Sequence, residues 1–268
     1  ELVNDSVDVV HIPHSIDTEV FTKHEAESIL EFRKRSFGED YKKTVFFWNN
    51  RNARRKQSGT LIFWFKEFLD RVGHDKATLV MHTDPFDVHG QNLEAIIMHL
   101  GLDKGQVMIS REKLPSQGLA ALYNMADCTI NIADAEGFGL GTLESLACET
   151  PVIVNMTGGL QEQVTDGKDW FGFGIEPSSK SIIGSQDIPW IYEDRINGDE
   201  FVDTLEKFYN LTEDERSAMG AAGRDHVLNN YGFDLFKDNW IKAIDDFCEK
   251  NGSWETRKGY TSWRIEEL

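Results

Sequence analysis

Short apolar runs alternate with amphipathic segments between residues 7 and 165. The apolar runs predict strands, because they are short, rich in β-branched residues and mostly unalternated, as strands buried on both faces of a sheet are. They are VDVVHI (7–12), TVFFWN (44–49), TLVMHT (78–83), QVMIS (106–110), CTINIA (128–133) and PVIVN (151–155).

The amphipathic segments repeat their apolar residues with a helical period. They predict helices over residues 24–36, 58–72, 90–100, 116–126, 140–148 and 158–165. Regular alternation of strand and helix is typical of a parallel sheet with right-handed crossovers. The fold class expected is therefore α/β, with a Rossmann-like, doubly wound parallel sheet.

The pattern changes after residue 165. Residues 170–199 mix Gly, Pro, Ser and aromatic residues, and they predict an irregular stretch, either a loop over a site or an insertion. Helices are expected near 199–209, 213–230 and 233–250, the second of them opened by a capping box of Thr212 and Glu215. The tail at 254–268 is polar and aromatic, so a short docking helix and a frayed end both remain open.

Composition narrows the classes of function. The net charge of −18 disfavours nucleic acid and anionic lipid as partners of the whole molecule. No apolar run reaches the length of a membrane span, and no secretory leader is visible. The chain has 3 cysteines, widely spaced and without a CxxC pair, which favours reduced thiols over disulfides or a metal site. A cytoplasmic location is the expectation.

One basic cluster stands out in this acidic chain: Arg51, Arg54, Arg55 and Lys56. It indicates a local anion site, with a solvated loop as the alternative. The cluster follows a predicted strand, and in an open parallel sheet ligands bind beyond the carboxyl ends of strands. Polar or glycine-rich segments follow three further strands, so the four strand ends are expected to meet at one crevice. These segments are NRNARRKQSG, REKLP, DAEGFGLGTLE and MTGGLQE.

The stretch EGFGLGTLE (136–144) has glycines that allow positive φ and close approach of a ligand to the main chain. The helix predicted to start at Leu140 would present free N–H groups and its positive dipole end, which suits an anion. GGLQE (158–162) gives the next predicted helix the same kind of glycine-rich start. Two such helix ends with Arg51 and Lys56 suit a diphosphate.

The same stretch holds two carboxylates, Glu136 and Glu144. A carboxylate accepts strong hydrogen bonds from two sugar hydroxyls at once. A diphosphate with sugar hydroxyls is the chemical description of a nucleotide-sugar. No dinucleotide-type GxGxxG and no GxxxxGK[ST] loop is present, and no His/Cys cluster has the spacing of metal ligands.

These segments together resemble the C-terminal, donor-binding domain of retaining glycosyltransferases of family 4, which have the two-domain GT-B fold. The resemblance covers about Val10 to Asn239. It rests most on EGFGLGTLE, which matches the family's E-x7-E motif. It rests also on the inter-domain segment HIPHSIDTEVF, the loop NRNARRK, the block LACETPVIVNMTGGLQEQVTDG and the helix signature SAMGAAGRDHVLNNYGFDLF.

The resemblance implies roles for the matching positions. Glu136 would contact the donor sugar near the reacting carbon, and Glu144 would hold the ribose. Arg51 and Lys56 would neutralise the departing diphosphate, and Arg111 would lie near the base. The remaining donor-binding positions implied are Phe138, Gly139, Leu140, Gly141, Thr142, Gly158 and Gly159. The family generally needs no metal, and no cofactor beyond the nucleotide-sugar donor is expected.

The resemblance also implies a domain division. Residues 1–22 would hold the inter-domain linker and first strand, 23–232 the nucleotide-sugar-binding domain, and 233–268 C-terminal helices placed to dock on a missing N-terminal domain. That domain would be on a separate or removed segment, so the isolated chain is expected to be incomplete for catalysis. His11 and His14, in the linker, are expected to serve a turn or an inter-domain contact.

Three positions depart from the family pattern: Asn50, Gln57 and Glu149 stand where it has glycine. Alternatives of other classes stay open. One is a non-catalytic nucleotide-sugar-binding or regulatory subunit of a split transferase, and another is a GT-B nucleotide-sugar epimerase. A phosphorylase is disfavoured, because the sequence shows no recognisable lysine context for pyridoxal phosphate. The sugar, the base and the acceptor (glycan, lipid or protein) have no readable motif.

Overall fold

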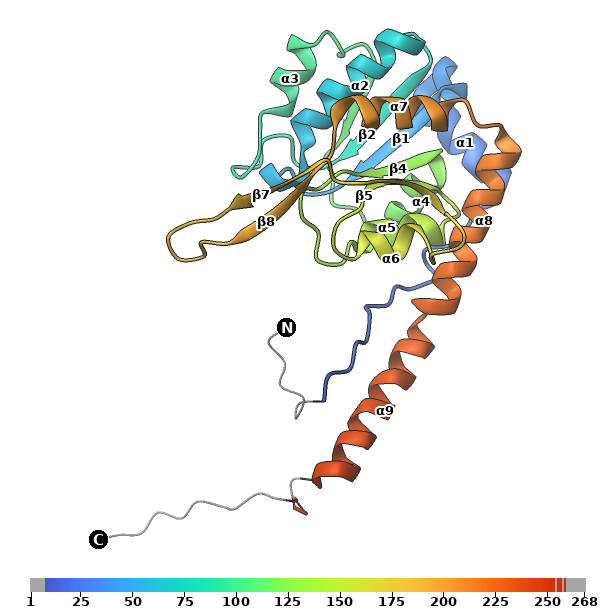
Figure 1. The fold of residues 1–268 in the computed structure, drawn as a ribbon. Helices are drawn as coiled ribbons and strands as arrows, with labels where there is room; N and C mark the ends of the chain where they lie inside the picture. The colour runs from blue at the N-terminus through green and yellow to red at the C-terminus, as the bar shows by residue number, and fades with distance from the viewer. Residues whose placement is uncertain (1–7, 254, 257, 259–268) are drawn as a thin grey trace.

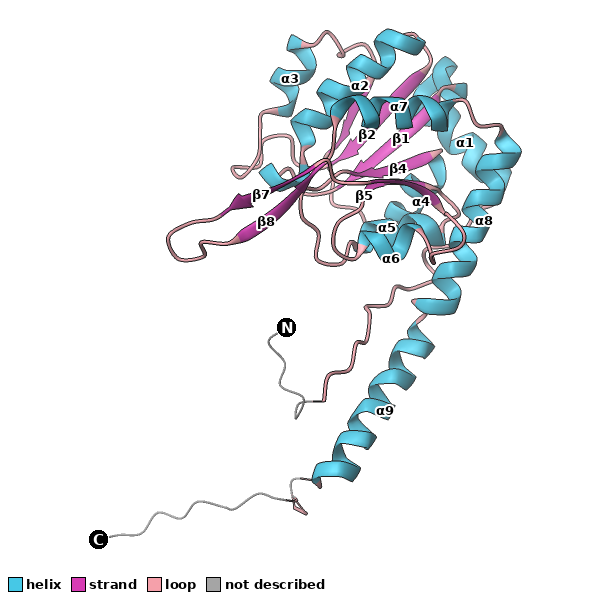
Figure 2. Ribbon diagram, in the orientation of Figure 1, coloured by secondary structure: helices cyan, strands magenta, loops and turns pink. Residues whose placement is uncertain are grey.

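The computed structural model describes residues 8–253, 255–256 and 258. Its centre is a six-stranded parallel sheet in the order β3-β2-β1-β4-β5-β6 (Figures 1 and 2). The chain winds outward in one direction from β1 and in the other from β4, so the switch point of the topology lies between these two strands. The strands are β1 (Thr44–Asn49), β2 (Ala77–His82), β3 (Val107–Ser110), β4 (Cys128–Asn131), β5 (Val152–Asn155) and β6 (Gly172–Ile175).

Helices cover both faces of the sheet, which confirms the doubly wound α/β fold. One face carries α2 (Ser58–Val72), α3 (Leu93–His99) and α7 (Gly198–Tyr209). The other face carries α1 (Ala26–Phe37), α4 (Ser116–Met125), α5 (Leu140–Ala147), α6 (Leu160–Val164) and α8 (Glu213–Asn230). Two short 3₁₀ helices, η1 (Gly38–Lys42) and η2 (Arg54–Lys56), lie in the connections.

Strand β1 shows why the predicted strands read as unbroken apolar runs. Its alternate residues point to opposite faces of the sheet. Phe46 and Trp48 pack into the core beneath α2 and α7, whereas Val45 and Phe47 pack into the core beneath α4 and α5. All four side chains are fully buried. Both faces therefore demand apolar residues, and the five predicted strands from 44 to 155 are confirmed within two residues at each end.

The strand predicted at 7–12 is wrong for the residues that the structure describes. Residues 8–15 form no regular element, and Val9 and Val10 are 68% and 65% exposed. A strand needs a neighbouring edge to satisfy its main-chain groups, and this segment leads away from the sheet (Figure 1). Ile16, directly after this segment, forms an isolated bridge to Gly232.

The prediction of an irregular stretch at 170–199 is also wrong. Strand β6 completes the sheet, and β7 (Ser179–Ile183) and β8 (Ile191–Arg195) form an antiparallel hairpin that projects from the domain (Figure 1). The sequence GFGI of β6 does not predict a strand, because glycine is a poor strand former. Here Gly172 is required, since a Cβ at this position would collide with the main chain of Val152.

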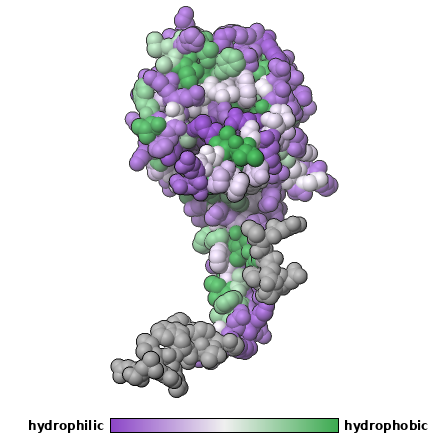
Figure 3. Space-filling model, turned by 60° about the vertical axis from the view of Figure 1, so that its left-hand side comes forward, coloured by the Kyte–Doolittle hydropathy of each residue, from purple (hydrophilic) through white to green (hydrophobic). Residues whose placement is uncertain are grey.

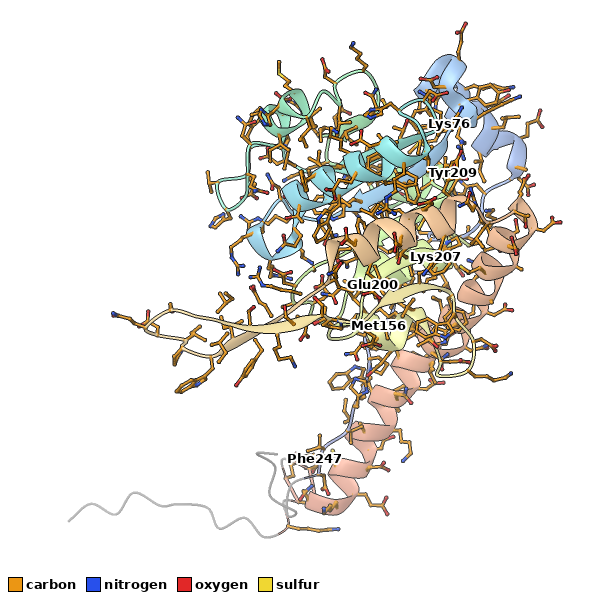
Figure 4. All side chains as sticks on the ribbon, turned by 45° about the horizontal axis from the view of Figure 1, so that its top comes forward. Lys76, Met156, Glu200, Lys207, Tyr209 and Phe247 are labelled. Carbon is orange, nitrogen blue, oxygen red and sulfur yellow. The ribbon has the colours of Figure 1, made fainter. Side chains whose placement is uncertain are left out.

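The last helix, α9 (Phe233–Asn251), extends away from the domain. None of its described side chains is buried. Figure 4 shows Phe247 near its far end, well separated from the sheet. Most of the tail expected at 254–268 lies outside the described residues.

The capping box predicted at the start of α8 is confirmed. The Thr212 hydroxyl accepts from the Glu215 N–H at 3.2 Å, and the Glu215 carboxylate accepts from the Thr212 N–H at 2.8 Å. Thr212→Ala is expected to lower the free energy of unfolding by about 1 kcal/mol, because the Glu215 N–H loses the hydroxyl that caps it. Urea denaturation measures this loss. Ser217→Ala, at an exposed position of the same helix, should cost no stability, and an equal loss in both variants would contradict the cap.

Candidate functional site

The segments that follow β1, β4 and β5 meet at the carboxyl edge of the sheet, beside the switch point. A cavity of about 260 Å³ opens there. Its walls combine main chain, carboxamides and one ion pair. They are formed by His14, Asn49, Asn50, Lys56, Thr129, Ile130, Asn131, Glu136, Phe138, Gly139, Leu140, Gly141 and Thr142. The predicted residues Glu136, Lys56 and Phe138 to Thr142 are thus brought together.

Helix α5 presents its amino end to this cavity. Gly139 precedes the helix with φ of 92°, a left-handed conformation that glycine adopts without strain. No side chain caps α5 within the described residues, and the first N–H groups of any helix have no helical partner. The Thr142 hydroxyl is buried and has no hydrogen-bond partner among the described residues. The cavity therefore offers unsatisfied donors to an anion or to hydroxyl groups.

Lys56 and Glu136 form an ion pair in the wall of the cavity. Their side chains are only 9% and 11% exposed. Burial lowers the pKa of the Lys56 ammonium, although the bond to Glu136 acts in the opposite direction. A buried ion pair of this kind places a fixed positive group beside a carboxylate that can accept from hydroxyls.

Gly158 and Gly159 support the loop of Glu136 from behind. The Gly159 N–H donates to the Gly137 carbonyl at 3.2 Å. A Cβ at Gly158, whose φ is 52°, would collide with the Glu136 carbonyl oxygen. Neither glycine is among the residues that line the cavity. The structure thus places them as packing residues directly behind the loop that forms part of the wall.

Glu144 is one step removed from the cavity. Its carboxylate accepts from the Tyr123 hydroxyl at 2.8 Å, and that hydroxyl accepts from the Asn49 amide at 2.8 Å. Burial raises the pKa of Glu144 above its ordinary value and raises that of Tyr123 well above its own. Asn49 lines the cavity, so it joins Glu144 to the wall through a fully buried tyrosine. Sequence reasoning missed Tyr123, which comes from α4.

Two further predicted residues, Arg51 and Arg111, also lie outside the cavity. Arg51 is 60% exposed and pairs with Asp87, its Nε lying 2.6 Å from the carboxylate. Arg111 pairs with Glu94 and covers the ring of Phe86. It follows β3, the edge strand that is separated from β1 by β2. In this arrangement neither guanidinium contributes to the wall.

His14 lines the cavity, although the sequence predicted a turn or an inter-domain contact for it. Its ring meets the ring of Phe138 edge-on, with centroids 5.0 Å apart. Its position two residues before Ile16, which bridges to Gly232, explains how the linker reaches the site. The only sequence signal was its place in the linker motif HIPHSID.

Among the described residues, no group of three or more His, Cys, Asp or Glu side chains is arranged to hold a metal ion. Cys128 and Cys148 are buried free thiols, and Cys248 is an exposed one. Burial raises the pKa of Cys148 to about 12, so this thiol stays protonated at neutral pH. No described helix has both the length and the hydropathy that crossing a membrane would require.

The curated proteins to which the chain is similar include the following two glycosyltransferases. It is 28% identical over 160 residues to a D-inositol 3-phosphate glycosyltransferase of Corynebacterium jeikeium, covering 59% of this chain and 38% of that protein. It is 27% identical over 228 residues to a GDP-mannose-dependent alpha-(1-6)-phosphatidylinositol monomannoside mannosyltransferase of Mycolicibacterium smegmatis, covering 82% and 52%. The chain thus spans about half or less of the length of these relatives.

Solved structures share the fold. Sucrose-phosphate synthase of Thermosynechococcus elongatus matches with a TM-score of 0.69 and 17% identity, over 89% of this chain and 52% of that chain. Anabaena HepE in complex with UDP and glucose matches with a TM-score of 0.67 and 15% identity, over 86% and 55%. The fold is therefore the one found in about half of a GT-B glycosyltransferase.

The family described as Glycosyl transferases group 1 matches residues 31–226, from within α1 to within α8. This range contains the whole six-stranded sheet and every residue of the cavity wall except His14. The match thus includes both the Lys56–Glu136 pair and the amino end of α5. The chain belongs to the glycosyl transferases group 1 family.

Proposed function

We propose that the chain is the donor-binding half of a retaining glycosyltransferase of family 4, and that its cavity binds a nucleotide-diphosphate sugar without a metal ion. The observation that carries this proposal is the amino end of α5 with its unpartnered Thr142 hydroxyl, placed in one cavity with the Lys56–Glu136 pair. Donors for an anion and an acceptor for hydroxyls are thus combined. The UDP and glucose named for the Anabaena structure fit this chemistry.

Each side of the cavity has a part in the proposed reaction. The bond between the anomeric carbon and the diphosphate oxygen breaks, and the acceptor hydroxyl forms the new bond on the same face. The acceptor proton passes to the departing phosphate. Lys56 and the N–H groups of α5 stabilise the negative charge that grows on the diphosphate, which is where preorganised donors act most strongly. Glu136 accepts from the sugar hydroxyls, and Glu144 accepts from the ribose.

The acceptor half of the enzyme is proposed to be an N-terminal domain that is not part of this chain. Helix α9 is suited to pack on it, because it carries exposed apolar side chains along its length. Figure 3 shows hydrophobic surface along this extension. These side chains include Phe233, Trp240, Ile241, Ile244 and Phe247, which are 47% to 63% exposed. The proposed acceptor is a glycan, a lipid or a protein. A cytoplasmic location is part of the same proposal.

A thermal-shift screen with UDP-, GDP- and ADP-sugars tests the proposal. A ligand at 100 times its dissociation constant stabilises the folded state by about 2.7 kcal/mol, so specific binding raises the melting temperature by several degrees. We expect the nucleotide-sugars of one base to raise the melting temperature more than those of the other two bases. A nucleotide-sugar epimerase would use the same cavity, and product analysis of the complete enzyme with an acceptor separates it from a transferase.

The pH dependence of binding tests the role of Glu144. Only its ionised form accepts from two ribose hydroxyls, so affinity for a nucleoside diphosphate should fall as the pH is lowered through the pKa of Glu144. Burial raises this pKa, so the fall should begin above the ordinary value of 4.5. Calorimetric titrations at several pH values measure it. In Glu144→Gln the part of the pH dependence that comes from Glu144 should disappear, and only the part that comes from protonation of the diphosphate should remain. Identical pH profiles of the variant and the unaltered chain would contradict the role.

A further inference from the structure

The base of the β7–β8 hairpin reaches the basic turn of the candidate site. Glu193, on β8, is 2% exposed. Its carboxylate forms ion pairs with Arg54 and with Arg195, the latter at 3.0 Å. Arg54 is the first residue of η2, the turn that carries Lys56. A hairpin more than 130 residues along the chain therefore holds the start of this turn.

The turn depends on such contacts to keep its shape. Gln57 ends it with φ of 57°, a left-handed conformation that is costly for a residue with a side chain. Gln57 donates to the Asp134 carboxylate, and the Asp134 N–H donates to the Arg55 carbonyl at 2.8 Å. Lys56 lies between these anchored residues, so its ammonium can be placed only where they allow.

Asp134 also connects the turn to the hairpin. The Asp194 N–H donates to the Asp134 carbonyl at 2.7 Å, and the Arg195 guanidinium lies 3.8 Å from the Asp134 carboxylate. Asp194 is held in turn by Asn155 and Thr157, at 2.7 and 2.8 Å. The hairpin base is thus fixed to the segments after β1, β4 and β5, and the first two of these segments line the cavity.

We infer that Glu193 is a positioning residue for the diphosphate: it fixes Arg54 and thereby the turn that delivers Lys56 to the cavity. This inference rests on the proposed function. The negative charge of Glu193 matters because the Arg54 side chain is 55% exposed. Without this carboxylate, the Arg54 guanidinium would be free to turn to solvent and would no longer hold the turn. The hairpin then serves donor binding from a position that has no contact with the donor itself.

The test compares Glu193→Gln, Arg54→Gln and the double variant in calorimetric titrations with UDP, GDP and ADP. Each single variant should bind the preferred diphosphate about tenfold more weakly, while affinity for the matching nucleoside stays unchanged. The double variant should bind no more weakly than the weaker single one, because both changes break the same link. Asp187→Asn, at an exposed position of the hairpin, is the matched control and should bind as the unaltered chain does.

Hydrogen exchange adds a readout that needs no ligand. In Glu193→Gln the peptide over residues 53–58 should exchange faster, while peptides of β1 and β4 keep their protection. Unchanged diphosphate affinity in Glu193→Gln, or additive losses in the double variant, would overturn the inference and leave the proposed function standing. Absence of binding by the unaltered chain would overturn both.

Discussion

Lys56→Met is expected to weaken the binding of the preferred nucleoside diphosphate about 100-fold, since truncating one partner of a buried charge pair costs roughly 2–5 kcal/mol. Two effects add. The cation proposed to face the diphosphate is lost, and Glu136, only 11% exposed, is left as an unpaired negative charge in the same cavity. Calorimetric titration with UDP, GDP and ADP measures the change.

The second effect can be separated from the first. In the double variant Lys56→Met with Glu136→Gln, the unpaired charge is gone, so part of the lost affinity should return. Lys168→Met removes a lysine whose side chain is 87% exposed, and it should bind as the unaltered chain does. Equal affinity of Lys56→Met and the unaltered chain would show that the diphosphate does not lie beside this pair.

Phe46→Ala is expected to lower the free energy of unfolding by about 3–5 kcal/mol, the usual cost of deleting a buried aromatic ring. Phe46 is fully buried in β1 and meets the rings of Phe65, Phe68 and Phe208 edge-on, with centroids 5.7 to 5.9 Å apart. Its loss leaves a cavity between the sheet and the helices α2 and α7. Urea denaturation should show a lower midpoint with an unchanged slope.

Phe63→Ala is the matched control, because Phe63 lies on α2 and is 47% exposed. Surface substitutions of this kind usually change stability by no more than about 0.5 kcal/mol. A loss at Phe46 no larger than that at Phe63 would contradict the position of β1 at the centre of the sheet.

The sequence predicted the sheet well where its strands are buried on both faces. Residues 45–48 of TVFFWN are all apolar because Phe46 and Phe47 face different cores. It failed at β6, where close packing against Val152 requires Gly172 in place of a typical strand former. The strand prediction failed also for residues 8–12, the described part of the run at 7–12, which form no regular element.

The candidate site divides in a similar way. The wall from Phe138 to Thr142 was predictable, because one local motif at one strand end places the whole segment. Arg51 and Arg111 were not, because a long, exposed side chain turns to whichever carboxylate tertiary structure puts nearby. Tyr123 and Glu193 come from other elements, and no spacing in the sequence links them to Glu144 or Arg54.

The central claim is that the cavity beside α5 binds a nucleoside diphosphate, and calorimetric titration of the chain with UDP, GDP and ADP tests it most directly. We expect saturable binding of at least one of them, and in Glu144→Ala a loss of affinity that is larger than the loss of folding stability. Absence of binding for all three at millimolar concentration, with the chain folded, would contradict the account.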